Sequence, residues 1–223
     1  MRYLSGIILL ILISYSAFAK DNLPVTPEKQ AYFTFDAAPL KKSQRKAVLD
    51  GDIIAMSDVK SFKGKILHQK PKKRIEEIEM QKFDFFIAGL HQRTCRFALK
   101  KLALYENYKQ YLGFVENSSY ASKESRVYLR ISHSILPIDM VLYFILPRIK
   151  KPGVYPFMFD VGFLKDLKGQ IHVSEYKKKC FFYATANWEG PNTGFSDTLF
   201  EFFSKGMAII AMENLFRISG GNK

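Results

Sequence analysis

Two side chains of this sequence could perform acid–base chemistry next to apolar residues. Asp139 lies in the apolar run IDMVLYFILP, where burial would raise the pKa of its carboxyl toward neutrality. The same carboxyl could equally lie at the end of a strand, in water. His133 shares strand parity with Ile131 and would lie near the interior, where a hydrogen-bonded structural histidine is the alternative. These two residues are weak catalytic candidates, and no assembled catalytic motif accompanies them.

The four histidines show none of the ligand spacings of metal sites. The sequence also has no phosphate-binding glycine loop, no nucleophile elbow and no paired carboxylate motif. We therefore expect no metal ion and no cofactor. His172 alternates with Ile171 and Val173, so its side chain should face either solvent or an internal cavity.

Cys95 and Cys180 are the two cysteines of the chain. An oxidising compartment would permit a disulfide between them. Closing so long a loop is worth roughly 4 kcal/mol in the chain-entropy account. Two unpaired thiols are the alternative, because sequence alone does not show that the two residues meet.

The most apolar segment is a helix predicted from residue 195 to residue 218. Ser196 suits the N-cap, Asp197 suits the positive end of the helix dipole, and two glycines at 220 and 221 end the helix. Only a narrow stripe of this helix is polar. Such a helix is either buried in an ordinary core or forms one wall of an apolar pocket.

The elements before this helix show two different periods. Alternation by two predicts a strand over residues 79–88, whereas spacings of three and four predict one helix, or two short ones, over residues 91–112. Several alternating runs separated by turns then follow without intervening helices, which indicates an antiparallel sheet. The sequence therefore predicts an α+β fold.

Three segments with their turns carry a resemblance to a known family: LALYENYKQYLGFVENSSY (102–120), DVGFLKDLKGQIHVSEY (160–176) and ANWEGPNTG (186–194). In their order they resemble the helix-grip fold of the START-like (SRPBCC) superfamily, specifically its coenzyme Q-binding and polyketide cyclase-like branch. The resemblance covers about residues 75–218. It implies a curved antiparallel sheet wrapped around the long C-terminal helix, with an apolar ligand held between them.

On this resemblance we expect a cavity for a hydrophobic small molecule or a lipid, such as an isoprenoid, and a role as carrier or sensor. A turn at Gly162 could act as its lid. One alternative is a cyclase- or hydrolase-like enzyme that uses the same cavity, and another is a packed interaction module without a ligand. The expected lining residues are Phe144, Phe159, Phe163, Trp188, Phe203, Met207 and Ile210.

The first 19 residues have the organisation of a secretory signal peptide. Arg2 precedes an apolar run from Ile7 to Ile13, and an A-x-A signal ends at Ala19. The run is shorter than the roughly 20 residues that span a bilayer, although an uncleaved anchor is the alternative. We therefore expect a protein exported across the inner membrane to the periplasm or beyond.

The rest of the chain divides by composition into four parts. Residues 20–47 should form a flexible basic tether, and residues 48–74 an extension with short strands. Residues 75–218 should form the START-like domain, and residues 219–223 a tail. The sequence thus predicts one folded domain that carries an N-terminal extension.

The formal net charge of +13, which falls to +12 when Arg2 is removed with the signal, bears on the partners. Nucleic acid is not expected as a partner, since the chain has no nucleic-acid-binding motif and carries a predicted export signal. An anionic membrane surface is a candidate partner, whereas solubility explains the charge equally well. We expect a monomer. The residues expected to dock on a membrane lie in two basic turns: Lys150, Lys151, Lys177, Lys178 and Lys179.

Overall fold

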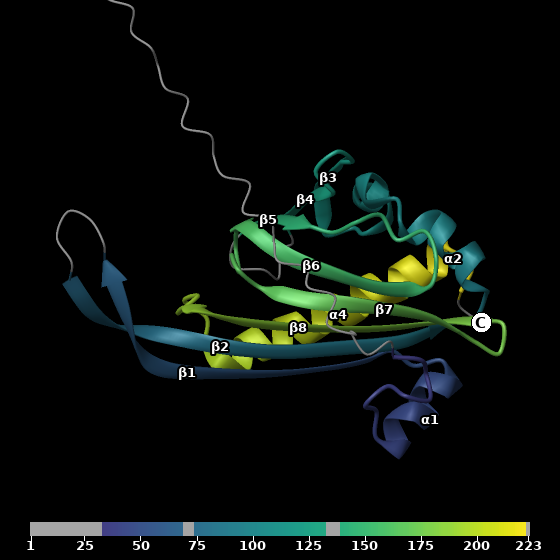
Figure 1. Ribbon diagram of the computed structural model, residues 1–223, viewed down its shortest axis with the longest axis horizontal. Coiled ribbons are helices and arrows are strands. Elements are labelled where there is room, and N and C mark those ends of the chain that lie inside the picture. The colour runs from purple at the N-terminus through teal and green to yellow at the C-terminus, as the bar shows by residue number, and fades with distance from the viewer. Residues whose placement is uncertain (1–32, 69–73, 133–138, 222–223) are drawn as a thin grey trace, which may run out of the picture. The chain divides into compact units, whose positions relative to one another are not determined.

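A computed structural model describes residues 33–68, 74–132 and 139–221. The predicted signal peptide, the first part of the predicted tether and His133 lie outside these residues. Within them, eight strands form one antiparallel sheet in the order β1-β2-β8-β7-β6-β5-β4-β3 (Figure 1). The long C-terminal helix α4 (Asp197–Ile218) packs against one face of this sheet. The expected α+β helix-grip fold is confirmed.

The first two strands of the structure are longer than the strands that the sequence predicts. The helices are α1 (Lys42–Asp50), α2 (Cys95–Leu102), the 3-10 helix η1 (Tyr105–Asn107) and α3 (Tyr108–Tyr111). The strands are β1 (Ile54–His68), β2 (Arg74–His91), β3 (Val115–Ala121), β4 (Arg126–Ile131), β5 (Met140–Ile145), β6 (Gly153–Gly162), β7 (Lys168–Tyr176) and β8 (Lys179–Pro191).

Helix α4 begins as the sequence predicts, because the Ser196 hydroxyl accepts a hydrogen bond from the Leu199 N–H at 3.4 Å. Its apolar residues meet the inward positions of the strands, where alternation places one side chain in two on the α4 face. In β4, for example, Val127, Leu129 and Ile131 are buried. No helix among the described residues is long and apolar enough to cross a membrane.

Strand β1 is an integral edge strand of the sheet, which corrects the expectation that residues 48–74 form a separate extension. The N–H of Val59 donates to Glu201 Oε1 at 3.0 Å, and the N–H of Ser61 donates to Asp197 Oδ2 at 2.9 Å. These α4 carboxylates satisfy backbone donors that an edge strand would otherwise leave unpaired. The residues of β1 alternate only weakly between apolar and polar side chains, so the sequence indicated short strands here but not their place in the sheet.

The segment before β1 is packed, which corrects the predicted flexible tether over its described part. Phe35, Ala38, Leu40 and Val48 are buried against the face of β2 and β8 that points away from α4. The Arg45 guanidinium also donates to the carbonyls of Phe35 and Ala38. The basic, proline-containing composition suggested a solvated linker, but four well-spaced apolar side chains are enough to fix the segment on the sheet.

A disulfide joins Cys95, the first residue of α2, to Cys180 of β8, with 4.6 Å between the Cα atoms. Of the two alternatives left open by the sequence, the bridge is therefore the one found. Glu175 of β7 accepts the Cys95 N–H at 2.8 Å and so caps α2. The helical segment is broken at Tyr105, which agrees with the two-helix alternative.

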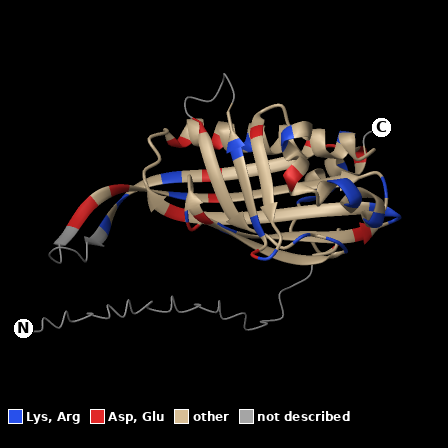
Figure 2. Cartoon of the chain, turned by 90° about the horizontal axis from the view of Figure 1, so that it is seen from above, with Lys and Arg blue, Asp and Glu red and all other residues tan. Residues whose placement is uncertain are grey.

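Strands β1 and β2 continue as a two-stranded ribbon beyond the rest of the sheet, because β2 pairs with β8 only from Met80 onward (Figure 1). Charges of opposite sign lie on the two strands of this ribbon, lysines on β1 and glutamates on β2 (Figure 2). Lys63 and Glu77 form an ion pair across it at 3.7 Å. The ribbon lies outside the space between the sheet and α4.

Candidate functional site

Two neighbouring cavities lie between the sheet and α4. Cavity A has a volume of about 300 Å³ and lies along the N-terminal half of the helix. Cavity B has a volume of about 410 Å³ and lies along the C-terminal half, next to α2 and η1. Contacts with the sheet and with these cavities thus account for part of the apolar circumference of α4, whereas Leu199, Phe202 and Ile210 are exposed.

Half of the residues that line cavity A are phenylalanines, and the others are aliphatic side chains, methionines and one serine. Its single hydroxyl-bearing side chain among the described residues is Ser204, whose Oγ donates to the Glu201 carbonyl at 3.0 Å. The wall therefore offers hydrocarbon contacts and no side-chain polar group in need of a partner. Eight phenylalanines form it: Phe83, Phe85, Phe157, Phe159, Phe163, Phe195, Phe200 and Phe203.

Phe200 of α4 is the ring around which this wall is organised. It stacks on Phe83 of β2 with 4.9 Å between the ring centroids, and it lies 6.2 Å from Phe163 of the β6–β7 turn. The indole of Trp188 packs on its side away from the cavity at 6.4 Å. Offset and edge-on ring pairs of this kind add about 0.5–1.5 kcal/mol each to the burial energy.

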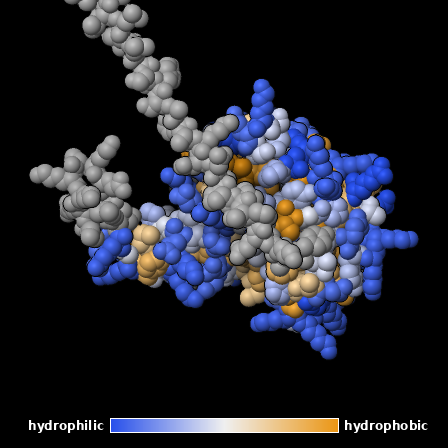
Figure 3. All heavy atoms as spheres, viewed as in Figure 1, coloured by the Kyte–Doolittle hydropathy of each residue, from blue (hydrophilic) through white to orange (hydrophobic). Residues whose placement is uncertain are grey.

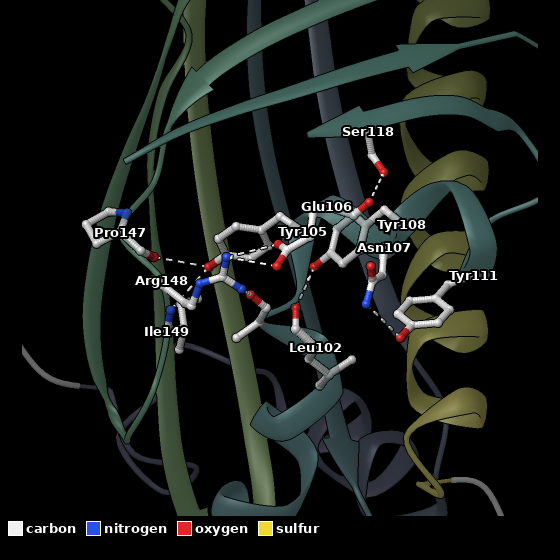
Figure 4. A network of polar contacts seen from close by, with 11 residues as sticks. Leu102, Tyr105, Glu106, Asn107, Tyr108, Tyr111, Ser118, Pro147, Arg148 and Ile149 are labelled. Atoms are coloured by element: carbon white, nitrogen blue, oxygen red, sulfur yellow. Dashed lines mark hydrogen bonds and ion pairs between the residues drawn. The ribbon is translucent and has the colours of Figure 1, made fainter. Parts of the chain in front are cut away.

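Cavity B contains two tyrosine hydroxyls, and both are occupied by main-chain groups (Figure 4). Tyr105 Oη donates to the Pro147 carbonyl at 3.1 Å and accepts the Ile149 N–H at 3.2 Å. Tyr108 Oη donates to the Leu102 carbonyl at 2.8 Å. Burial raises the pKa of both hydroxyls far above 10, so they remain neutral.

Arg148 holds the outer side of this end of the molecule together (Figure 4). Its guanidinium makes an ion pair with Glu106 at 2.9 Å, donates to the Ala103 carbonyl, and lies 4.4 Å from the ring centroid of Tyr120. Ser118 adds a second tie, since its Oγ donates to the Glu106 carbonyl at 2.8 Å. These contacts bind η1 and α3 to β3 and to the β5–β6 connection.

A partition of aromatic rings separates the two cavities. Phe157, Phe159 and Ala208 line both of them. Phe159 is in turn stacked on Phe144 at 5.1 Å with an interplanar angle of 19°. Because the same three residues border both volumes, the cavities lie side by side as two lobes with these residues between them.

Five of the seven expected lining residues border these cavities. Phe159, Phe163, Phe203 and Met207 line cavity A, and Phe144 lines cavity B. The missed lining residues on β2, Phe83 and Phe85, had a signal, since they alternate with charged residues in the run MQKFDFF. Phe195 and Phe200 had none, because an apolar helix and its approach do not reveal which side is inward.

Trp188 and Ile210 are corrections. Trp188 is buried behind Phe200, and its Nε1–H donates to the Lys165 carbonyl at 2.8 Å, so it supports the β6–β7 turn instead of lining the cavity. Ile210 is 46 % exposed on the outer side of α4. Met207, Ala208 and Ala211 line the cavities, so the side of α4 that carries Ile210 faces away from them.

Asp139 is not part of either cavity, which corrects its candidacy as a buried acid. Its side chain is exposed and forms an ion pair with Arg130 at 2.9 Å. Hydrogen bonds from Ser132 and then from Arg130 lower the pKa of its carboxyl below the usual value. The strand-end alternative is thus the one observed, and a carboxyl of this kind is ionised at neutral pH.

The basic turns are placed together but away from cavity A. The pairing of Gly153 with Val173 sets the start of β6 beside the end of β7, so Lys150 and Lys151 share one end of the sheet with Lys177–Lys179. Phe163 of the β6–β7 turn borders cavity A at the opposite end. The lysines expected to dock on a membrane therefore lie at the end of the sheet away from this turn.

His172 faces neither solvent nor a cavity. It is 1 % exposed on the sheet face covered by the N-terminal segment, where the Phe33 N–H donates to its Nδ1 at 3.5 Å. Burial lowers the pKa of its imidazole. In the described part of the chain, no cluster of three or more histidine, cysteine or acidic side chains is arranged to hold a metal ion.

Among the comparisons with known proteins, only the comparison of structures found matches. No family model and no curated protein sequence matches the chain. The Zhui aromatase/cyclase from Streptomyces sp. R1128 aligns with a TM-score of 0.52 at 8% identity, over 63% of this chain and 94% of its own. Ara h 8.0201 aligns with a TM-score of 0.50 at 6% identity, over 63% and 99%. A START superfamily protein from Mycobacterium smegmatis aligns with a TM-score of 0.49 at 7% identity, over 61% and 97%.

Proposed function

We propose that this protein, whose fold is the START-like helix-grip fold, binds a hydrophobic small molecule or lipid in cavities A and B. The observation that carries the proposal is the wall of eight phenylalanines in cavity A, whose one hydroxyl is already hydrogen-bonded. Transfer of each CH₂ group from water into such a space is worth about 0.8 kcal/mol. Apolar burial is thus the driving force that the site offers.

Binding is favoured over catalysis by the chemistry of the walls. One similar structure is an aromatase/cyclase, so a cyclase-like enzyme is the second candidate. A cyclase needs a group that moves protons, but the described walls of both cavities contain no carboxylate, imidazole or amine. Their two tyrosine hydroxyls are held neutral by burial and occupied by main-chain groups.

The place of action proposed here is outside the inner membrane. The signal-like first 19 residues support this, and so does the disulfide, since such bonds persist mainly in oxidising compartments. In the periplasm or beyond it, an apolar ligand needs a carrier or a sensor that shields it from water. A carrier or sensor of lipid or isoprenoid is therefore the finer form of the proposal.

Native mass spectrometry of the mature protein from its own host, followed by organic extraction, tests the proposal. A co-purifying hydrophobic molecule of fixed mass is the expected result and would name its chemical class. An apo mass that does not change when lipids or quinones are added would overturn the proposal.

Two neighbouring residues provide a matched pair of variants. Phe203 lines cavity A, whereas Phe202 is 66 % exposed on the outer side of the same helix. Phe203→Glu places a carboxylate in the apolar wall and should remove the bound molecule, because an unpaired charge is costly to bury. Phe202→Glu introduces the same group into water and should leave the bound molecule in place.

A further inference from the structure

We infer that the ligand is a single long hydrocarbon chain, which enters cavity A tail first, passes the aromatic partition into cavity B and leaves its polar group outside. This inference rests on the proposed function and adds the ligand's chemical class and its orientation. Three features of the described residues carry it: satisfied polar groups in both lobes, an exposed apolar rim at one end, and a buried wall at the other end.

The interior has no side-chain hydrogen-bond donor left for a buried polar group. Ser204 donates to a carbonyl of its own helix, and Tyr105 and Tyr108 donate to the carbonyls of Pro147 and Leu102. A hydroxyl or carboxyl carried into either lobe would lose its water and meet no free side-chain donor, and such a loss weakens binding by an order of magnitude or more. The buried part of the ligand is therefore hydrocarbon.

The rim beside the N-terminal end of α4 is apolar and partly exposed. Phe163, Phe195 and Phe203 line cavity A and are each partly exposed. In the view of Figure 3 the surface is mainly hydrophilic, with hydrophobic residues in separate spots.

Charged side chains lie next to this rim, where the head group of a bound ligand would stay in water. Lys165, Asp166 and Lys168 are exposed in and beside the β6–β7 turn, whose Phe163 borders the cavity. They carry both signs of charge. The rim therefore accepts a polar end without selecting one charge.

The far end, in contrast, is bounded by buried side chains. Leu99, Leu102, Tyr105, Ile149 and Phe216 line cavity B and are each less than 9 % exposed. The Cys95–Cys180 disulfide and the Arg148 contacts hold the helical segment over them (Figure 4). From cavity A, a chain reaches cavity B by passing Phe157 and Phe159.

The single tryptophan reports on the orientation of the chain. Trp188 lies at the cavity A end, next to Phe200 and bonded to the turn at Lys165. Bromine quenches indole fluorescence over short distances, so the probes are 2-bromohexadecanoic acid and 16-bromohexadecanoic acid. Both should be displaced by hexadecanoic acid, but the 2-bromo acid should quench Trp188 strongly and the 16-bromo acid weakly. The reverse order would overturn the tail-first orientation, whereas absence of binding by all three would overturn the proposed function itself.

A chain-length series tests the passage between the lobes. For 1-alkanols the affinity should rise about fourfold per CH₂ beyond the length that fills cavity A. Ala208→Leu narrows the junction and should stop this rise at a shorter chain. A wild-type rise that ends where the variant's rise ends would confine the ligand to cavity A and overturn the inference.

The hydrocarbon character of the interior is tested by a second hydroxyl. 1,16-Hexadecanediol carries one hydroxyl that must enter the cavities or fold back to the rim. It should bind at least tenfold more weakly than 1-hexadecanol. Equal affinities would show that the interior accepts a polar end and would overturn the assignment.

Discussion

Gln81 shows how one buried polar side chain can position a whole loop. It is fully buried on β2, where its amide NH₂ donates to the Phe195 carbonyl at 2.9 Å and to Asp197 Oδ1 at 3.0 Å. Its amide oxygen accepts the Thr193 N–H at 2.9 Å and the Thr193 hydroxyl at 2.7 Å. These bonds fix the β8–α4 connection, and with it the Phe195 ring at the rim of cavity A.

Gln81→Ala should lower the free energy of unfolding by about 2–3 kcal/mol, because it leaves buried donors and acceptors without partners. Urea unfolding followed by circular dichroism measures the change. Asn187→Ala, an exposed amide on neighbouring β8, is the matched control and should cost less than about 0.5 kcal/mol. Equal effects of the two substitutions would contradict the role assigned to Gln81.

Two buried histidines make stability depend on pH. Burial lowers the pKa of His172 and of His91, whose Nε2 lies 3.0 Å from the Ser219 hydroxyl. Since the unfolded chain titrates near 6.5, it binds more protons than the folded chain just below that pH. Stability should therefore be full above pH 6.5 and fall as the pH is lowered toward the depressed values. Thermal unfolding between pH 8 and pH 5 measures this, and His172→Phe should flatten the dependence; an unchanged pH profile would contradict it.

Asp139 gives a residue-scale test of the enzymatic alternative. Its exposed carboxyl faces Arg130 on the surface, so Asp139→Asn should change neither the melting temperature nor the affinity for hexadecanoic acid measurably. Fluorescence titration of Trp188 measures the affinity. A large loss of binding or of any turnover would return this residue to the site.

At the scale of elements, the disulfide connects the helical segment over cavity B to the sheet. Cys95 and Cys180 are 85 residues apart, and Cys95 begins the helix whose buried face includes Leu99 and Leu102. The bridge thus joins α2, which lies beside cavity B, to β8, whose residues line both cavities. The position of this wall depends on it.

Replacing both cysteines with alanine should lower the free energy of unfolding by about 4 kcal/mol, because the open loop of the unfolded chain gains conformational freedom. Urea titration with and without dithiothreitol measures this. The reductant should destabilise the wild type and leave the double variant unchanged. Destabilisation of the double variant by dithiothreitol would show that the effect is not due to this bond.

At the scale of the whole molecule, charge and cavity are separated. The basic turns at residues 150–151 and 177–179 lie at one end of the sheet, and the apolar rim at Phe163 and Phe195 lies at the other. An anionic membrane surface remains our proposed partner for the lysines, at about 1 kcal/mol for each well-placed charge. Contact through this end would be peripheral and would leave the rim free.

Reversal of the charge at all five lysines should abolish binding to vesicles that contain anionic lipid, while the affinity for hexadecanoic acid delivered from cyclodextrin stays the same. Vesicle sedimentation and Trp188 fluorescence measure the two properties separately. Vesicles of neutral lipid are the control, since neither protein should bind them electrostatically. Unchanged vesicle binding would count against docking through the lysines, and lost uptake would place them at the mouth.

Local sequence patterns were sufficient for the element order and for the apolar interior. Alternation by two in β4 and β7, spacings of three and four in α2, and the cap at Ser196 each depend on residues close together in the chain. Five of the seven expected cavity residues border the cavities, but the sequence patterns did not show that Trp188 and Ile210 lie outside them.

Only the tertiary structure decided which apolar residues are inward and which segments belong to the sheet. Helix α4 is apolar on nearly every side, so its rotation, which turns Ile210 out and Ala208 in, is set by contacts with β1 and the cavities. Strand β1 and the segment at Phe35 have weak local signals, and partners far away in sequence, Glu201 and Phe181, place them. The sequence by itself determined the α+β order and an apolar centre, whereas packing between distant residues determined the shape of the site.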